Sequence, residues 1–135
     1  WLEEGPKNDI QLIEPHDKTK EPVLVIALST KAILDRIADR FGDTVSLWSI
    51  TCNEPGNDMM RSHSQLKQFN QVVRMAMDTI KTAHSKADCL KIFMAAPASC
   101  AVELGRIRMP KADLPWVLYD YWVDKDEDIE TITIK

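Results

Sequence analysis

The sequence predicts a three-layer α/β sandwich with a mainly parallel sheet. The chain has 135 residues, which is the usual size of one domain. Short apolar runs alternate with longer amphipathic segments along most of it, as in strands connected by helices. Residues 23–28 are apolar at every position, as in strands that are buried on both faces of a parallel sheet. Right-handed crossovers then place helices on both faces of the sheet.

The first 22 residues differ in character from the rest. They contain three prolines and mixed charges, and only residues 10–13 form an apolar stretch. We therefore expect residues 1–22 to be a linker or edge segment with one edge strand. Residues 23–135 are expected to form the folded domain, and residues 23–28 its first core strand.

The middle of the chain predicts two helices around a second core strand. Apolar residues at helical spacing predict a helix over residues 30–41, and Gly42 suits its C-terminal cap. Residues 44–50 are rich in β-branched and aromatic side chains and predict the second core strand. A loop is expected over residues 51–61, and a long apolar stripe then predicts a helix over residues 64–84.

The last third of the chain predicts two more core strands and an edge strand. Residues 88–95 form a third apolar strand, and Pro97 suits the first turn of another helix. Residues 116–121 predict a fourth core strand, and the alternating residues 129–134 predict a fifth strand at an edge. An acidic cluster between these two strands is expected to be a solvated turn. It consists of Asp124, Asp126, Glu127 and Asp128.

Charge and composition exclude several classes of protein. The formal net charge is −4, which argues against a protein that coats duplex DNA or RNA through its phosphates, although local donors can still bind a small anion. No apolar run approaches the roughly 18 residues of a membrane span. The chain begins at Trp1 without a methionine or a secretory signal, and its three cysteines form no C-x-x-C pair. We expect a fragment of a cytoplasmic protein with reduced thiols and no membrane segment.

The sequence lacks the motifs of common catalytic sites. Its four glycines are too widely spaced for a dinucleotide fingerprint or a phosphate loop. Its three histidines show no metal-binding spacing, so neither a metal nor a cofactor is expected. Ser99 and Cys100 lie at a strand-to-helix junction, where hydrolases place nucleophiles, but the glycines of a nucleophile elbow are absent. No catalytic residue is assigned.

The candidate binding site lies where the first and third core strands end. In a doubly wound sheet of order 2-1-3-4 these strands are neighbours, and their following helices depart to opposite faces, which leaves a crevice at the carboxyl ends. Two helix N-termini then converge, and their free N–H groups and positive dipole ends favour an anion. The crevice would be lined by Ser29, Thr30, Lys31, Pro97, Ala98 and Ser99.

Polar residues of the neighbouring loops could complete this crevice. Lys31 could contact a phosphate, and Asn53 or Arg61 could reach the same rim from the next loop. A purely structural role competes with the functional one. The hydroxyls of the first loop could be helix N-caps, and Ser99 could be a residue of a first helical turn.

Some aromatic residues are expected in the core, whereas the sequence leaves two roles open for others. Tyr119 and Tyr121 share one face of the fourth core strand by alternation, and Trp122 is expected to begin a loop at its carboxyl end. Tyr121 or Trp122 could stack on a base there, or pack under a neighbouring domain. The residues expected in the core are Trp48, Phe69 and Phe93.

The later part of the chain resembles a known family. Residues 92–106, IFMAAPASCAVELGR, followed by WVLYDY at residues 116–121, resemble the end of SAVED domains, the cyclic-oligonucleotide sensors of bacterial anti-phage CBASS signalling. The apolar strand with Ser29 and the loop NEP at residues 53–55 are also similar to this family. The likeness covers roughly residues 20–122, and its most specific part is the pattern A-P-A-S-x-A-x-x-L-G-R.

The resemblance implies a Rossmann-like (CARF-like) fold, in which a full SAVED unit joins two halves and binds its ligand where they meet. This chain resembles the second, C-terminal half, so self-association or an amino-terminal half would complete the pocket. Ligand binding would promote assembly and activate a fused or associated effector, and any catalytic activity is expected in that effector. The positions that match ligand-facing ones are Ser29, Thr30, Lys31, Pro97, Ala98, Ser99 and either Tyr121 or Trp122.

Three interpretations of function remain open. The first is a sensor domain that binds a cyclic di-, tri- or tetranucleotide reversibly, without catalysis, and changes its association as the output. The second is a Rossmann-like enzyme, a hydrolase or ring nuclease, that cleaves the cyclic nucleotide, although no general base accompanies the positioned hydroxyls. The third is an interaction module with an empty crevice, in which residues 1–22 and the final strand make the contacts.

Overall fold

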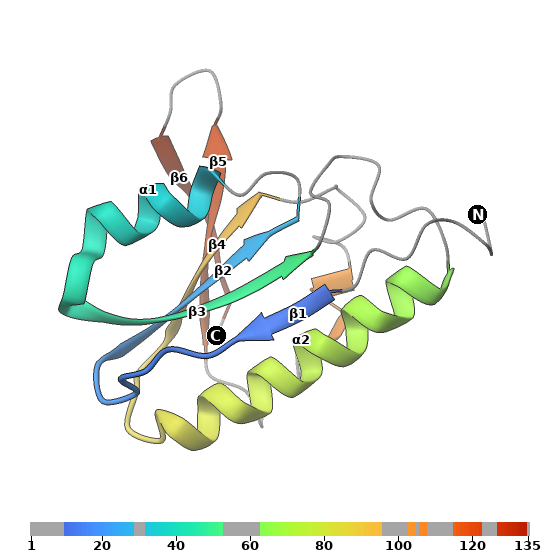
Figure 1. Cartoon of the computed structure of the whole chain (residues 1–135), viewed down its shortest axis with the longest axis horizontal. Coiled ribbons are helices and arrows are strands. Elements are labelled where there is room, and N and C mark those ends of the chain that lie inside the picture. The colour runs from blue at the N-terminus through green and yellow to red at the C-terminus, as the bar shows by residue number, and fades with distance from the viewer. Residues whose placement is uncertain are drawn as a thin grey trace.

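The computed structural model describes residues 10–28, 32–52, 63–95, 103–104, 106–107, 115–122 and 127–134. The strands in this part of the chain are β1 (Ile10–Ile13), β2 (Glu21–Ala27), β3 (Val45–Cys52), β4 (Leu90–Ala95), β5 (Trp116–Trp122) and β6 (Glu127–Ile134). The helices are α1 (Ala32–Phe41) and α2 (His63–Ala83), with a 3-10 turn η1 (Gly42–Thr44) directly after α1. Figure 1 shows these elements in the whole chain.

One six-stranded sheet contains these strands in the order β1-β3-β2-β4-β5-β6. The four central strands run parallel, and β1 and β6 pair antiparallel at the two edges (Figure 1). The predicted order 2-1-3-4 of the core strands is therefore confirmed, as are the two expected edge strands. The fold is a three-layer α/β sandwich with a mainly parallel sheet.

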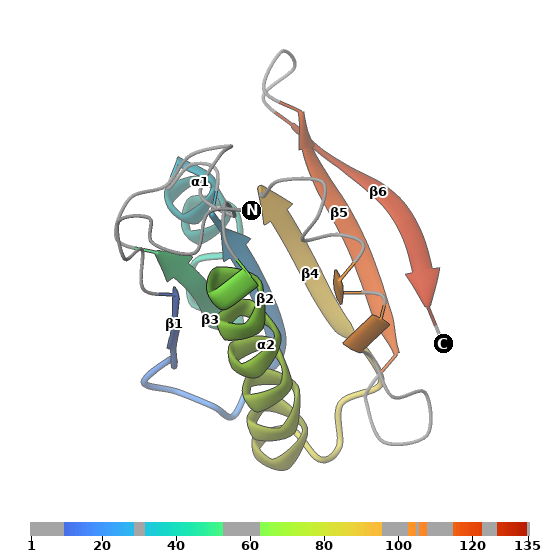
Figure 2. The same cartoon turned by 90° about the vertical axis from the view of Figure 1, so that its right-hand side faces the viewer.

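Helices cover both faces of the sheet, because β2 has no polar side to turn toward water. Successive residues of β2 point to opposite faces, and each face forms its own apolar cluster with one helix. Figure 2 shows α2 lying along one face, with α1 behind the sheet. Leu24, Ile26 and Leu28 pack with α2, whereas Val23, Val25 and Ala27 pack with α1.

The aromatic residues expected in the core are found there. Trp48 and Phe69 are 0% exposed, and Phe93 is 1% exposed. Trp48 and Phe69 lie in the cluster under α2, and Phe93 lies in the cluster under α1. Large aromatic side chains therefore fill both layers between the sheet and its helices.

Some boundaries differ from the prediction. β3 continues to Cys52, beyond the expected end at residue 50, because its last residues pair with both neighbouring strands. Glu127 and Asp128 lie in β6 rather than in a solvated turn, since they pair with the end of β5. Asp124 and Asp126 lie outside the described residues. Hairpin pairing at an edge tolerates the charges from which the turn was predicted.

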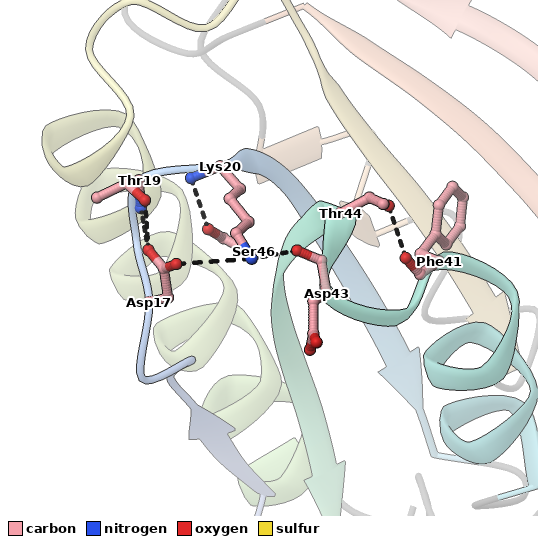
Figure 3. Close-up of polar contacts among 7 residues, drawn as sticks. All are labelled: Asp17, Thr19, Lys20, Phe41, Asp43, Thr44 and Ser46. Atoms are coloured by element: carbon pink, nitrogen blue, oxygen red, sulfur yellow. Dashed lines mark hydrogen bonds and ion pairs between the residues drawn. The ribbon is translucent and has the colours of Figure 1, made fainter.

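Polar contacts fasten the segment before β2 to the rest of the sheet (Figure 3). Asp17 accepts hydrogen bonds from the backbone N–H and the hydroxyl of Thr19. The N–H of Lys20 donates to Ser46 Oγ at 3.1 Å. The ammonium of Lys20 donates to the carbonyl of Asp43 and lies 3.7 Å from the Asp17 carboxylate. The chain is thus joined to β3 and to η1 just before β2 begins.

A buried histidine joins the end of α2 to β3. His84 is 6% exposed, and its Nε2 accepts a hydrogen bond of 3.0 Å from Nε1 of Trp48. Burial lowers the pKa of His84; a hydrogen bond with the backbone of Lys20 opposes this effect, and the charge of Lys18 adds to it. The lowered pKa favours the neutral imidazole, which is the form that can accept the bond from Trp48.

Helix α1 ends at a glycine with a left-handed backbone. The φ angle of Gly42 is 55°, a value that residues with a Cβ adopt only at a cost. A Cβ added there would meet no atom within 4 Å. The predicted C-terminal cap is confirmed, and its need for glycine lies in the backbone rather than in packing.

Replacing Gly42 should therefore destabilise the domain through the backbone alone. We expect Gly42→Ala to lower the free energy of unfolding by about 1 kcal/mol, measured by urea denaturation. Gly42→Asn should lower it less, because asparagine tolerates the left-handed region. Equal losses in the two variants, or no loss in either, would contradict this reading of the cap.

Acid should destabilise the domain through His84. The pKa of His84 is lower in the folded chain than in the unfolded chain. The contribution of His84 to the free energy of unfolding is therefore complete above the ordinary pKa of about 6.5, and it is lost as the pH falls from there toward the folded pKa. At pH 7.5, we expect the free energy of unfolding of His84→Gln to be about 1–3 kcal/mol below that of the wild type. Between pH 7.5 and 5.5, this free energy should fall less in His84→Gln than in the wild type. Denaturation at both pH values measures this difference, with the exposed His16→Gln as control. A wild-type acid response in His84→Gln would rule out this role.

Candidate functional site

The parallel strands bring their carboxyl ends to one edge of the sheet, where the predicted site lies. At this edge β2 and β4 are direct neighbours, since Ala27 pairs with Ala95. The N–H of Leu28, one residue past β2, donates to the carbonyl of Ala95 at 2.9 Å. The chain therefore leaves the first and third core strands from adjacent positions.

The segments that follow these two strands pack on opposite faces. After β2, helix α1 contributes Ile33 and Ile37 to one cluster. After β4, the helical residue Leu104 belongs to the other cluster, together with α2, and Ile107 packs against it. Arg74 of α2 donates to the carbonyl of Ile107 at 3.1 Å. This divergence defines a topological switch point, the usual place for ligands in open α/β sheets.

Small and buried side chains form the floor of this edge. Ala27 is 0% and Ala95 9% exposed, and Cys52 at the end of β3 is 1% exposed. The Sγ of Cys52 lies 3.8 Å from the carbonyl oxygen of Leu28. The side chains at these strand ends are thus small or closely packed, which is why the residues predicted to contact a ligand are ones that follow the strands in the sequence.

Most of the predicted ligand-binding residues lie outside the described residues. These are Ser29, Thr30, Lys31, Asn53, Arg61, Pro97, Ala98 and Ser99. The opening of a helix at Pro97 lies outside them as well.

The structure corrects the place of Trp122. Tyr121 and Trp122 are the last two residues of β5, and they pair with Asp128 and Glu127 of β6. Trp122 was expected to begin a loop, and that expectation is wrong, because the hairpin extends β5 to this residue. Tyr121 lies within β5, as predicted.

Tyr119 is part of an aromatic stack in the core layer under α1. Its ring lies parallel to that of Phe93, with centroids 4.5 Å apart and an interplanar angle of 9°. Phe41, at the end of α1, meets Phe93 edge to face at 5.7 Å. A register shift between Leu118 and Tyr119 accompanies this arrangement. Tyr119 therefore helps to close the core beside the site.

A buried carboxylate in the helix after β4 was not foreseen. Glu103 is 9% exposed, and its Oε1 accepts a hydrogen bond of 2.9 Å from Nη1 of Arg106. The signal that could have revealed this pair is the i, i+3 spacing of opposite charges in E-L-G-R. The pair joins two helical residues that follow the helix start predicted at Pro97.

The described residues show neither a metal-binding cluster nor a membrane span. Among them, no three His, Cys, Asp or Glu side chains gather closely enough to hold a metal ion. In the same part of the chain, no helix is both long and apolar enough to cross a membrane.

One protein family matches the sequence over nearly its whole length. The model of the SMODS-associated and fused to various effectors sensor domain, SAVED, matches residues 1–134. The chain therefore belongs to the SAVED family. A sequence comparison with curated proteins finds no match.

Solved receptors have a similar fold. One is the Acinetobacter baumannii Cap4 SAVED/CARF-domain containing receptor with the cyclic trinucleotide 2'3'3'-cAAA, with a TM-score of 0.68 and 19% identity over 97% of this chain and 28% of that chain. The receptor with 3'3'3'-cAAA gives a TM-score of 0.68 and 18% identity over the same shares of the two chains. A further structure of the receptor gives 0.66 and 19% identity over 92% of this chain and 25% of that chain.

At 18–19% identity, the structural similarity establishes the CARF-like fold and not the ligand. This chain spans about a quarter of the length of the receptors, because it covers 25–28% of them.

Proposed function

We propose that this domain is a sensor that binds a cyclic oligonucleotide second messenger at the carboxyl edge of β2 and β4. The observation that carries the proposal is the SAVED family match over residues 1–134. The hydrogen-bonded ends of β2 and β4 support the location, because their following segments diverge at a switch point. The similar Cap4 receptors with cyclic trinucleotides support the ligand class.

The proposed contacts divide by chemistry. Backbone N–H groups at two helix N-termini would bind phosphates, and Lys31, Asn53 and Arg61 would add polar contacts at the rim. Tyr121 or Trp122 would stack on a base. The residues proposed to bring backbone N–H groups to the ligand are Ser29, Thr30, Ala98 and Ser99. Pro97, which has no N–H, would line the crevice and begin the second helix.

Ligand binding is proposed to act through assembly. Because the chain spans about a quarter of the similar receptors, a second half or another copy would complete the pocket. Binding across such a boundary stabilises the assembled state by mass action. In this proposal the output is activation of a fused or associated effector in cytoplasmic anti-phage defence, and the sensor itself does not catalyse a reaction. The division into a segment 1–22 and a sensor domain 23–135 also remains a prediction.

A panel of cyclic oligonucleotides tests the proposed ligand class. Di-, tri- and tetranucleotides of different bases are added to the chain, and its thermal unfolding is followed. A true ligand should raise the stability by about 2.7 kcal/mol at 100 times its Kd, and linear oligonucleotides of the same base should not. If no cyclic nucleotide raises the melting temperature, the domain is an interaction module. Conversion to linear products in the same samples would identify a ring nuclease instead.

Charge reversal in the two loops tests the proposed location. Ser99→Asp and Ser29→Asp each place a carboxylate where a phosphate is proposed to bind, and should weaken binding by about tenfold or more. The melting temperature of the free protein should change little, because neither change enters the two described apolar clusters. Calorimetric titration measures the affinity.

A matched control comes from the opposite edge of the sheet. Thr82 is exposed in the last turn of α2 and lies outside the pocket described below, so Thr82→Asp introduces the same charge far from the proposed site. Its affinity for the cyclic oligonucleotide should stay at the wild-type value. Unchanged affinity in both Ser99→Asp and Ser29→Asp would reject the carboxyl edge as the site.

A further inference from the structure

A pocket lies at the amino-terminal edge of the sheet, opposite to the site proposed above. Its volume is about 590 Å³, within the range of small-molecule sites. The lead into β2 and the connection from α2 to β4 form its walls, and these two segments lie together at the lower left of Figure 1. Its polar lining includes Lys18, Lys20, His84, Ser85, Lys86 and Lys91.

Lysines outnumber carboxylates in this lining, although the whole chain carries a net charge of −4. Four lysines line the pocket, against the two carboxylates of Glu21 and Asp88. The C-terminal end of α2 also faces this region and adds about half a negative charge. A single lysine would neutralise this partial negative charge, so the end of the helix does not explain why four lysines line the pocket.

The lysines on the β2 side of the pocket are held by neighbouring groups. Lys18 Nζ lies 2.6 Å from the carboxylate of Glu14 and 5.5 Å from the ring centre of Trp48. Lys20 Nζ lies 3.7 Å from the Asp17 carboxylate. These contacts position the two ammonium groups but also reduce the charge that they offer to a ligand.

The lysines on the other side have no such partner among the described residues. Lys86 is exposed in the turn after α2, and Lys91 is half-buried in β4, with its Nζ 6.0 Å from the ring centre of Phe41. Within the described part of the chain, no carboxylate lies within 4 Å of either ammonium group. An ammonium group with three free N–H donors is well suited to a phosphate oxygen.

We propose that this pocket is a second binding site, for an anion with a diphosphate group, and that Lys86 and Lys91 are its main contacts. A diphosphate offers two phosphoryl groups, one for each of these lysines, and the volume of the pocket accommodates it. The site is separate from the carboxyl edge and does not depend on the function proposed there. His84 forms a buried part of the wall, so a bound anion lies close to its imidazole.

Calorimetry of the whole chain with pyrophosphate tests this site. We expect binding that weakens as NaCl is raised, because salt screens exposed charges. Lys86→Glu should weaken it about tenfold or more, and Lys91→Gln, a milder change within a strand, should weaken it in the same direction. The control Lys67→Glu changes an exposed lysine of α2 outside the pocket and should keep the affinity within about twofold.

The source of the diphosphate is decided by comparing pyrophosphate with ADP. Equal affinities would assign the site to the diphosphate group alone. A higher affinity for ADP would show that the nucleoside also makes contacts, so the natural ligand is a nucleotide. Ser99→Asp should leave the affinities for pyrophosphate and ADP unchanged, because this residue belongs to the site proposed at the carboxyl edge. The proposal for the pocket can therefore be contradicted without contradicting the proposed function, and the reverse.

Histidine NMR signals locate the anion. His84 lines the pocket, whereas His63 begins α2, about 30 Å away along a helix of 21 residues. Pyrophosphate should shift the ring signal of His84, assigned with His84→Gln, and leave that of His63 in place. A shift at His63 alone would place the anion at the other edge and overturn the proposal. Undetectable binding, or wild-type affinity in both Lys86→Glu and Lys91→Gln, would also overturn it.

Discussion

The burial of β2 on both faces and both edges is the constraint on which this fold depends. β2 pairs in parallel with β3 on one side and β4 on the other, and residues 23–27 are at most 1% exposed. Parallel pairing requires long crossovers, and a strand without a polar side needs cover on both faces. These two requirements place α1 and α2 on opposite faces. They also bring the ends of β2, β3 and β4 to a single edge, where the site is proposed.

The same constraint explains why most of the fold could be predicted from the sequence. The apolar run at residues 23–28 and the glycine at residue 42 are local signals that the tertiary structure follows. The ends of β3 and β5 and the start of β6 were not predicted, because they depend on pairing between strands rather than on composition. Glu127 and Asp128 are strand residues in spite of their charge, since an edge strand can carry charged side chains.

Less of the candidate site than of the fold could be predicted from the sequence. The strand order was predicted correctly, and it makes the ends of β2 and β4 neighbours. That a ligand binds at these ends stays a prediction. The packing of Tyr119 on Phe93 depends on the register of β5 and on its bulge, which no local pattern reveals. The amino-terminal pocket was missed for a similar reason. Its lysines come from two segments more than 60 residues apart in the sequence, Lys20 and Lys86 among them, and neither segment has a motif.

The two edges of the sheet thus carry different chemistry, helix N-termini at one and lysines at the other. The central claim is that the carboxyl edge of β2 and β4 binds the cyclic oligonucleotide. Backbone amide NMR during a titration with a cyclic trinucleotide tests it most directly. The claim predicts the largest shifts at Leu28, Ala95 and the first turn of α1, with little change at Lys86. The largest shifts at the amino-terminal edge, or none at the carboxyl edge with a bound ligand, would contradict it.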